Sequence, residues 1–244
     1  MSEAPALKRG LSILAYLRDN PDADSNELSS RLNIPPASLS RLTETLVNED
    51  FLRVRCNGGW SIGNALRYVA FSTYDRDPVT IQVLPILESL SRRWRATFVC
   101  YEFIDERRIL WRVKSEPKNG ISTQSCGFVT HDLHCNAQGN VFLSTMSDEE
   151  IRNYVSGNDL RRITPETLTD VDSLLSRVQY VRENGYCYQK NENHKSMQQV
   201  AVPLEITNEP AILCIGCYLP LQFTNMEAII EDILTEALTL NVVI

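Results

Sequence analysis

Three short helical patterns, followed directly by a strand, a glycine turn and a second strand, fill the first 62 residues. This order constrains the fold more than any other feature of the chain. We expect helices over residues 5–19, 25–33 and 36–50 and strands over 51–55 and 60–62, with the turn at 57–59. The pattern predicts a winged helix-turn-helix domain over residues 1–62.

Local signals set the expected faces and ends of these helices. The leucines of the first helix recur at helical spacing, and we expect Leu7, Leu11, Leu14 and Leu17 to form its buried stripe. Ser25 is the expected N-cap of the second helix. Pro36 fits the first turn of the third helix, where a missing N–H costs nothing.

The third helix combines an apolar side with a small, polar outer side. Leu39, Leu42 and Leu46 are expected to face inward, which leaves the serines and one arginine outside. A helix of this kind suits the major groove of DNA, and arginines on the hairpin behind it can grip phosphate. The predicted DNA-contacting residues are Pro36, Ser38, Ser40, Arg41, Thr43, Arg53 and Arg55. The alternative for this helix is an ordinary solvated face.

The charge distribution bears on that prediction. The chain carries a formal net charge of -7, all of it beyond residue 76, because residues 1–76 hold nine basic and nine acidic side chains. Phosphate contacts supply most non-specific affinity for DNA, so a neutral module needs dimerisation for useful occupancy. The alternative is a dimeric protein-interaction or metabolite-binding module whose winged helix no longer binds DNA.

The rest of the chain predicts a linker and a second domain. A helical pattern over 63–76 indicates the linker, and Asp77-Pro78 starts a new helix with an expected bend at Pro85. We expect strands at 96–103, 108–114, 186–189, 197–206 and 211–219 and helices at 137–146, from 148, at 168–185 and at 226–240, with 116–130 as loop. Helices flanking a mostly antiparallel sheet make an α+β domain over 77–244.

No pattern typical of an enzyme or a metal site stands out. His131, His134 and Cys135 match no closed zinc spacing, and a local hydrogen bond is the expected role of His134. Cys214 and Cys217, three apart on a strand, should face opposite sides. We therefore expect no catalytic residue, metal or cofactor. No apolar run approaches the roughly 20 residues that span a bilayer, so we expect a cytoplasmic protein.

An ordered series of segments resembles the IclR-type bacterial transcriptional regulators over nearly the whole chain. The segments are LKRGLSILAYL, LSSRLNIPPASLSRLTETLVNEDFL, WSIGNALRYVA, DLHCNAQGNVFLSTMSDEE and GYCYQKNENHKSMQQVAVPL. The resemblance implies a winged helix-turn-helix joined by a helix to a GAF-like mixed α/β effector-binding domain. It also implies a homodimer or homotetramer on double-stranded operators of catabolic genes, which represses or activates and is reset by a small metabolite, often a carboxylate or an aromatic compound.

The chain departs from the family at the positions that carry the usual polar set of the pocket. Gln189 stands where many members have Asp, Gln199 where Cys is frequent, and Asn140 where Lys is frequent. The resemblance and the strand positions give the candidate effector-binding residues Tyr101, Trp111, Gly127, Ala137, Gln189, Gln199, Gly216 and Tyr218. Either the effector differs from a small oxo acid or the pocket no longer binds a ligand. Glu192 in the same stretch is expected to be a solvated side chain.

Overall fold

A computed structural model describes residues 4–56, 58–74, 76–105, 107–118, 124–206 and 212–240. Asn57 of the expected hairpin turn and Ala211 of the last expected strand lie outside these ranges. The chain divides into two compact units, Met1–Arg76 and Asp77–Ile244. Together they confirm the predicted class, a helix-turn-helix unit followed by a mixed α/β unit.

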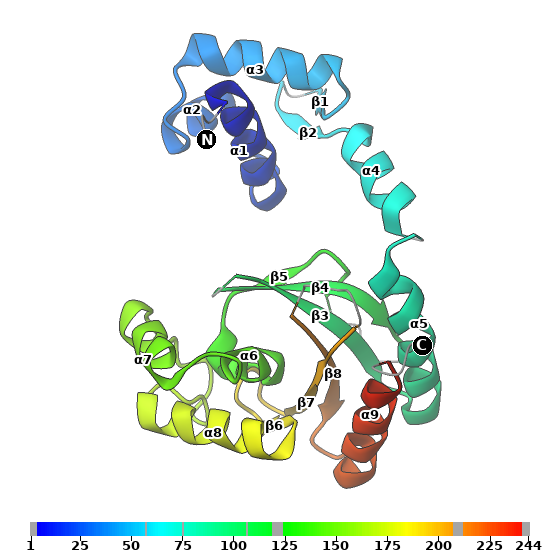
Figure 1. The fold of residues 1–244 in the computed structure, drawn as a ribbon. Coiled ribbons are helices and arrows are strands. Elements are labelled where there is room, and N and C mark those ends of the chain that lie inside the picture. Colours follow the sequence, from blue (N-terminus) through cyan, green and yellow to red (C-terminus); the bar gives the residue numbers. More distant parts are fainter. Residues whose placement is uncertain are drawn as a thin grey trace. The chain divides into compact units, whose positions relative to one another are not determined.

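The N-terminal unit has the element order of a winged helix (Figure 1). It contains α1 (Pro5–Asp19), α2 (Ser25–Arg31), α3 (Pro36–Asn48), β1 (Leu52–Val54), β2 (Trp60–Ile62) and α4 (Asn64–Tyr74). The two strands pair antiparallel, with Arg53 opposite Ser61. Its apolar core joins the first three helices to the hairpin, so the hairpin and α3 form one body.

Two local expectations for this unit are wrong. The buried face of α1 consists of Gly10, Ile13, Leu14 and Leu17, whereas Leu7 and Leu11 are 64% and 57% exposed. At 3.6 residues per turn these two leucines lie to one side of the buried face, and packing against α3 and β2 selects that face. The N-cap of α2 is Asp24 instead of Ser25, because its carboxylate accepts the amide hydrogen of Glu27 at 2.8 Å.

Gly63 fixes where α4 begins. A Cβ on this residue would lie 2.0 Å from the carbonyl oxygen of Asp50, and Gly63 N donates to Phe51 O at 2.8 Å. Ala65 N donates to Asp50 O at 3.0 Å, which holds the first turn of α4 against the end of α3. No described side chain of α4 is fully buried, although Leu66 packs on the core.

The C-terminal unit is built on one six-stranded sheet with the order β5-β4-β3-β8-β7-β6. The strands are β3 (Thr97–Asp105), β4 (Arg108–Ser115), β5 (Val129–Thr130), β6 (Cys187–Lys190), β7 (Met197–Leu204) and β8 (Leu213–Pro220), each pair antiparallel. The five longer strands lie where the sequence predicts them. β5 falls in the stretch expected to be loop, because two residues are too short to show alternation.

Helices cover both faces of this sheet (Figure 1). On one face lie α5 (Pro78–Trp94) and α9 (Met226–Leu240), and on the other lie α6 (Ala137–Leu143), α7 (Asp148–Gly157) and α8 (Val171–Asn184). A short 3-10 helix, Leu133–Cys135, precedes α6, which ends three residues earlier than expected. Asp77 caps α5, Ser147 and Glu150 form a capping box on α7, and Gly185 ends α8 at φ 75°, as the sequence predicts.

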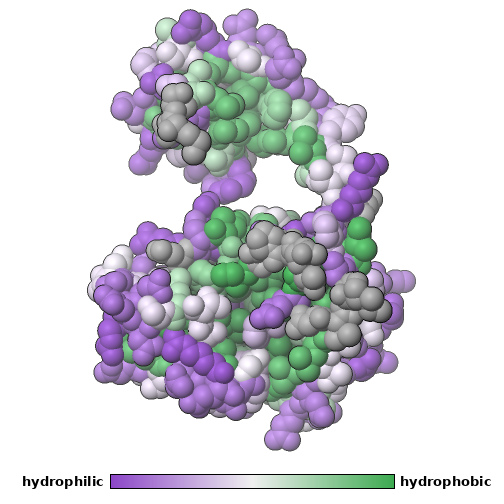
Figure 2. Space-filling view, in the orientation of Figure 1, coloured by the Kyte–Doolittle hydropathy of each residue, from purple (hydrophilic) through white to green (hydrophobic). Residues whose placement is uncertain are grey.

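Hydrophilic and hydrophobic residues are unevenly distributed over the surface. Figure 2 shows hydrophilic residues over α7 and α8 and an area of hydrophobic residues over the N-terminal unit at the position of α1. Among the described residues, no helix combines the length and the apolar character that crossing a membrane requires.

Candidate functional site

Helix α3 presents the predicted DNA-facing side chains from a buried base. Leu39 is buried in the core, whereas Leu42 and Leu46 pack half-buried against it. On the other side Ser40, Arg41 and Pro36 are exposed and Ser38 is half-buried. The helix therefore holds a guanidinium and small hydroxyls outward on a rigid support.

Thr43 does not belong to this outer face. It is only 4% exposed, and its hydroxyl donates to the carbonyl oxygens of Leu39 and Ser40 at 3.0 Å each. Its position four residues after Leu39 places it on the inner side of the helix. The prediction that Thr43 contacts DNA is therefore wrong for this conformation.

The two arginines of the hairpin are paired within their own unit. Arg53 Nε lies 3.3 Å from Asp50 Oδ1, and Arg55 Nη1 lies 2.7 Å from Asp22 Oδ1. Each charge is therefore compensated by a neighbouring carboxylate. The tertiary structure brings Asp22 to Arg55 across 33 residues, which no local pattern indicates.

Arg9, which no sequence pattern indicates, lies beside Arg41. The two arginines line one depression of about 270 Å³ between α1 and α3, together with Ser38, Leu42 and Thr45. Among the described residues, no carboxylate forms an ion pair with Arg9 or Arg41. Only the packing of α1 on α3 reveals this pair, since the sequence separates them by more than 30 positions.

A second candidate site lies between the sheet and the start of α6. Its wall is aromatic: Trp111 stacks on Tyr218 with ring centres 5.6 Å apart and meets Tyr101 edge-on at 5.4 Å. Tyr101 and Trp111 are almost fully buried, and no described residue accepts the Trp111 Nε1 hydrogen. A Cβ on Gly216 would lie 3.2 Å from the Tyr101 ring, so the glycine leaves room for that ring.

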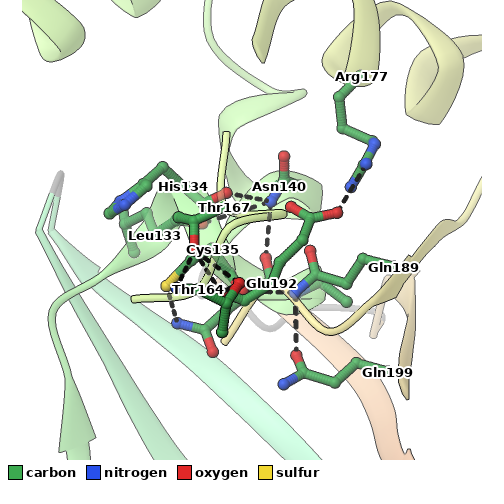
Figure 3. Close-up of polar contacts among 12 residues, drawn as sticks. Leu133, His134, Cys135, Asn140, Thr164, Thr167, Arg177, Gln189, Glu192 and Gln199 are labelled. Atoms are coloured by element: carbon green, nitrogen blue, oxygen red, sulfur yellow. Dashed lines mark hydrogen bonds and ion pairs between the residues drawn. The ribbon is translucent and has the colours of Figure 1, made fainter. Parts of the chain in front are cut away.

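Side-chain amides line the part of the site next to these aromatic rings. Gln199 Oε1 accepts hydrogens from Ala137 N at 3.2 Å and from Gln189 Nε2 at 3.4 Å, and Gln189 Nε2 also donates to Cys135 O (Figure 3). Gln138 Nε2, a residue missed in the sequence, donates to the Tyr218 hydroxyl at 2.9 Å. Burial raises the pKa of Tyr218 to about 12, although the neighbouring Tyr101 hydroxyl and the hydrogen bond from Gln138 oppose the shift.

Gly127 is the member of the predicted set that lies at the margin. It is exposed, at φ 87°, and its backbone N–H donates to Trp111 O at 2.9 Å. The next residue, Phe128, packs edge-on against Trp111 with ring centres 5.8 Å apart. The structure thus brings together seven of the eight predicted residues, and Gly127 orders the rim beside them.

Glu192 is not the solvated side chain that the sequence suggests. It is 5% exposed, and Oε1 pairs with Arg177 Nη2 at 2.8 Å, as Figure 3 shows. Its carbonyl oxygen accepts the Thr167 hydroxyl at 2.6 Å. Burial raises the pKa of Glu192, and Arg177 works against that rise. Arg177 on α8 and Thr167 before that helix are 15 and 25 positions from Glu192, so no short motif predicts these contacts.

The structure also places His134, Cys214 and Cys217. His134 forms a hydrogen bond, but not the local one expected: a ring nitrogen lies 3.0 Å from Arg161 O, 27 positions further along the chain. Cys214 and Cys217 belong to the cores on opposite faces of the sheet, as the strand spacing predicts. Within the described ranges, no group of three His, Cys, Asp or Glu side chains is arranged for a metal.

Family models match both units. The IclR helix-turn-helix domain matches residues 6–55, and the C-terminal domain of the bacterial transcriptional regulator IclR matches residues 71–234. The chain belongs to the IclR family. Its helix-turn-helix domain is therefore that of a DNA-binding transcriptional regulator, and its C-terminal unit is the IclR effector domain.

Individual IclR relatives agree with this assignment. The Pca regulon regulatory protein of Pseudomonas putida is 25% identical over 82% of this chain and 68% of its own length. The fold of an IclR regulator from Alicyclobacillus acidocaldarius matches with a TM-score of 0.84 at 21% identity, over 98% of both chains. An IclR homologue from Microbacterium hydrocarbonoxydans complexed with 4-hydroxybenzoate matches with a TM-score of 0.80 at 20% identity, over 96% of this chain and 97% of that one.

Proposed function

We propose that this IclR-family regulator reads operator DNA with the outer face of α3 and that a small effector bound under α6 changes its occupancy. One observation carries the DNA-binding part: Arg41 stands exposed and without a described carboxylate partner on a helix anchored by Leu39, with Arg9 beside it. A planar guanidinium can hold a guanine edge or a phosphate through two hydrogen bonds. Ser38, Ser40 and Pro36 complete the contact surface.

Two copies are needed for this reading. The first 76 residues carry no net charge, so a single copy gains little from phosphate attraction. Helix α4 exposes Tyr68, Val69 and Phe71 at 73%, 59% and 74%, a set of large apolar side chains on the linker. We infer that a second copy covers them and pairs the two recognition helices on half-sites about 34 Å apart, or a multiple of that spacing.

The effector acts on this assembly by shifting a population. A ligand between the sheet and α6 favours whichever packing of residues 77–244 it binds better, and the linker over residues 63–76 passes the change to the winged helices of residues 1–62. The bound 4-hydroxybenzoate of the Microbacterium homologue supports an effector in this unit. We place the regulator in the cytoplasm, on operators of catabolic genes.

A footprint tests the proposal. Purified protein is titrated against the DNA upstream of its own gene and against selected random duplexes, and Arg41→Ala is compared with the wild type. Loss of a guanine or phosphate contact should weaken specific binding by about 1–3 kcal/mol per site. Arg152→Ala, an exposed arginine on α7, is the control and should leave the footprint unchanged. If a gel-shift experiment at low salt detects no complex with DNA, that result would instead support a winged helix that no longer binds DNA.

A further inference from the structure

The effector site forms one continuous row across the sheet. Gln189 pairs with Gln199 between β6 and β7, and Gln199 pairs with Tyr218 between β7 and β8. Tyr218 stacks on Trp111, so two amides and two rings lie in sequence on the side that faces α6. A flat molecule lying along this row would meet aromatic faces at one end and carboxamide edges at the other.

Two buried polar atoms on this row have no described hydrogen-bond partner. Gln189 Oε1 is an acceptor without a donor, and Trp111 Nε1 is a donor without an acceptor, and both side chains are at least 95% buried. A buried polar group that is left without a hydrogen-bond partner destabilises the protein. A ligand that presents an N–H to the first atom and an oxygen or ring nitrogen to the second would recover that energy.

The described arginines beside the row already have carboxylate partners. The backbone N–H of Ala137 at the start of α6 already donates to Gln199 Oε1. Arg177 pairs through Nη2 with the buried carboxylate of Glu192, although its buried Nη1 has no described hydrogen-bond partner, and Arg161 lies 3.1 Å from Asp132. The groups that shift the pKa values of Tyr101 and Tyr218 are burial and neighbouring tyrosine, cysteine and glutamine side chains, with no cation among them. A buried carboxylate would lose its water and meet the lone pairs of two amide oxygens.

We propose that the effector is an uncharged planar aromatic or heteroaromatic compound that carries a carboxamide or lactam edge. Its ring packs on Trp111 and Tyr218, and its N–H donates to Gln189 Oε1. This inference rests on the proposed effector site and narrows the ligand from any small metabolite to a neutral amide. A free aromatic acid is the disfavoured class, because Arg161 and Arg177 each already pair with a carboxylate of this chain.

Matched ligand pairs that differ only in charge test the inference. Isothermal titration of the full-length protein at pH 7 compares benzamide with benzoate, nicotinamide with nicotinate, and 4-hydroxybenzamide with 4-hydroxybenzoate. We expect the amide of at least one pair to bind at least about tenfold tighter than its acid, since a site built to hydrogen-bond rejects the wrong partner strongly. Equal affinities, tighter binding of the acids, or no binding of any amide overturns the proposal.

A substitution tests whether Gln189 causes the preference for amides over acids. Gln189→Leu removes the amide acceptor and should reduce the amide-to-acid ratio to about one, whereas Gln179→Leu, an exposed glutamine on α8, should preserve it. An unchanged ratio in Gln189→Leu overturns the assigned contact, and the ligand pairs measured on the wild type still decide the ligand class if this variant does not fold. A footprint that responds to an acid and not to amides leaves the proposed function standing and overturns only the ligand class.

Discussion

At the scale of single residues, ion pairing separates arginines that look alike in the sequence. Arg53 and Arg55 are paired with Asp50 and Asp22, whereas Arg9 and Arg41 share a depression in which no described carboxylate pairs with them. An arginine already paired in its own domain gives up that partner before it can bind phosphate. We therefore rank Arg9 above the hairpin arginines as a phosphate contact.

Arg9→Ala tests this ranking. If Arg9 contacts phosphate, the variant should weaken binding to all duplexes alike and reduce the slope of log affinity against log salt by about 1 per site. Affinities measured by fluorescence anisotropy across a salt series give the slope. Arg18→Ala on the same helix, whose guanidinium lies 2.6 Å from Asp19, is the control and should leave the slope unchanged. A slope that does not move in Arg9→Ala contradicts the assignment.

At the scale of elements, the start of α5 combines a local signal with a tertiary one. Asp77 caps the helix by accepting the Thr80 amide hydrogen at 2.8 Å, and it also lies 2.6 Å from Arg112 on β4. Burial opposes ionisation of Asp77, but the hydrogen bonds from Arg112 and Thr80 outweigh it and lower the pKa of this carboxyl below 3.8. The ion pair therefore ties the first turn after the linker to the strand that carries Trp111.

Asp77→Asn isolates the ion pair, because asparagine keeps the cap and loses the charge. A carboxyl with a lowered pKa in the folded state contributes stability above its ordinary pKa and loses that contribution as the pH falls through the lower value. We expect the variant to be about 1–3 kcal/mol less stable at pH 7, and the difference to shrink as the pH falls below 3.8. Urea unfolding at several pH values measures it.

The N-cap of α8 supplies the matched control. Asp170 accepts the Ser173 amide hydrogen at 2.8 Å and forms no ion pair with a described cation, so Asp170→Asn should change the stability much less. Equal losses for the two variants would mean that capping alone, and not the bond to Arg112, accounts for the role of Asp77.

At the scale of the whole molecule, we expect exposed side chains of the linker to form the interface between two copies. Phe71 and Tyr68 on α4 are 74% and 73% exposed in the single chain, which is costly unless another surface covers them. Phe71→Glu places a charge in that surface and should shift the mass measured by light scattering toward the 27.7 kDa monomer. Specific DNA binding should weaken with it, because paired half-sites need paired helices.

A surface leucine elsewhere checks that prediction. Leu238 on α9 is 65% exposed, so Leu238→Glu adds the same charge to another apolar position and should leave the mass of the wild type unchanged. A monomeric wild type, or a Phe71→Glu variant with the wild-type mass, contradicts the inferred interface.

Much of this architecture is local and can therefore be predicted from the chain. Caps and turns act within a few residues, so Asp77, Ser147 and Gly185 mark helix ends without any knowledge of the fold. Apolar spacing of 3.6 or 2 likewise separates helices from strands, and the five longer strands of the sheet follow from it. The ordered segments of the IclR family settle which known fold these elements build.

Only the tertiary structure decided which distant residues are in contact. The buried faces of α1 and α3 depend on what packs against them, which exposes Leu7 and Leu11 and buries Thr43. Gln199 meets Ala137 across 62 positions, and Glu192 meets Arg177 from another element. Periodicity tells which residues share a face of a helix or strand. The partner that neutralises a charge or completes a hydrogen bond comes from elsewhere in the chain. A local sequence pattern does not indicate which distant residue that partner is.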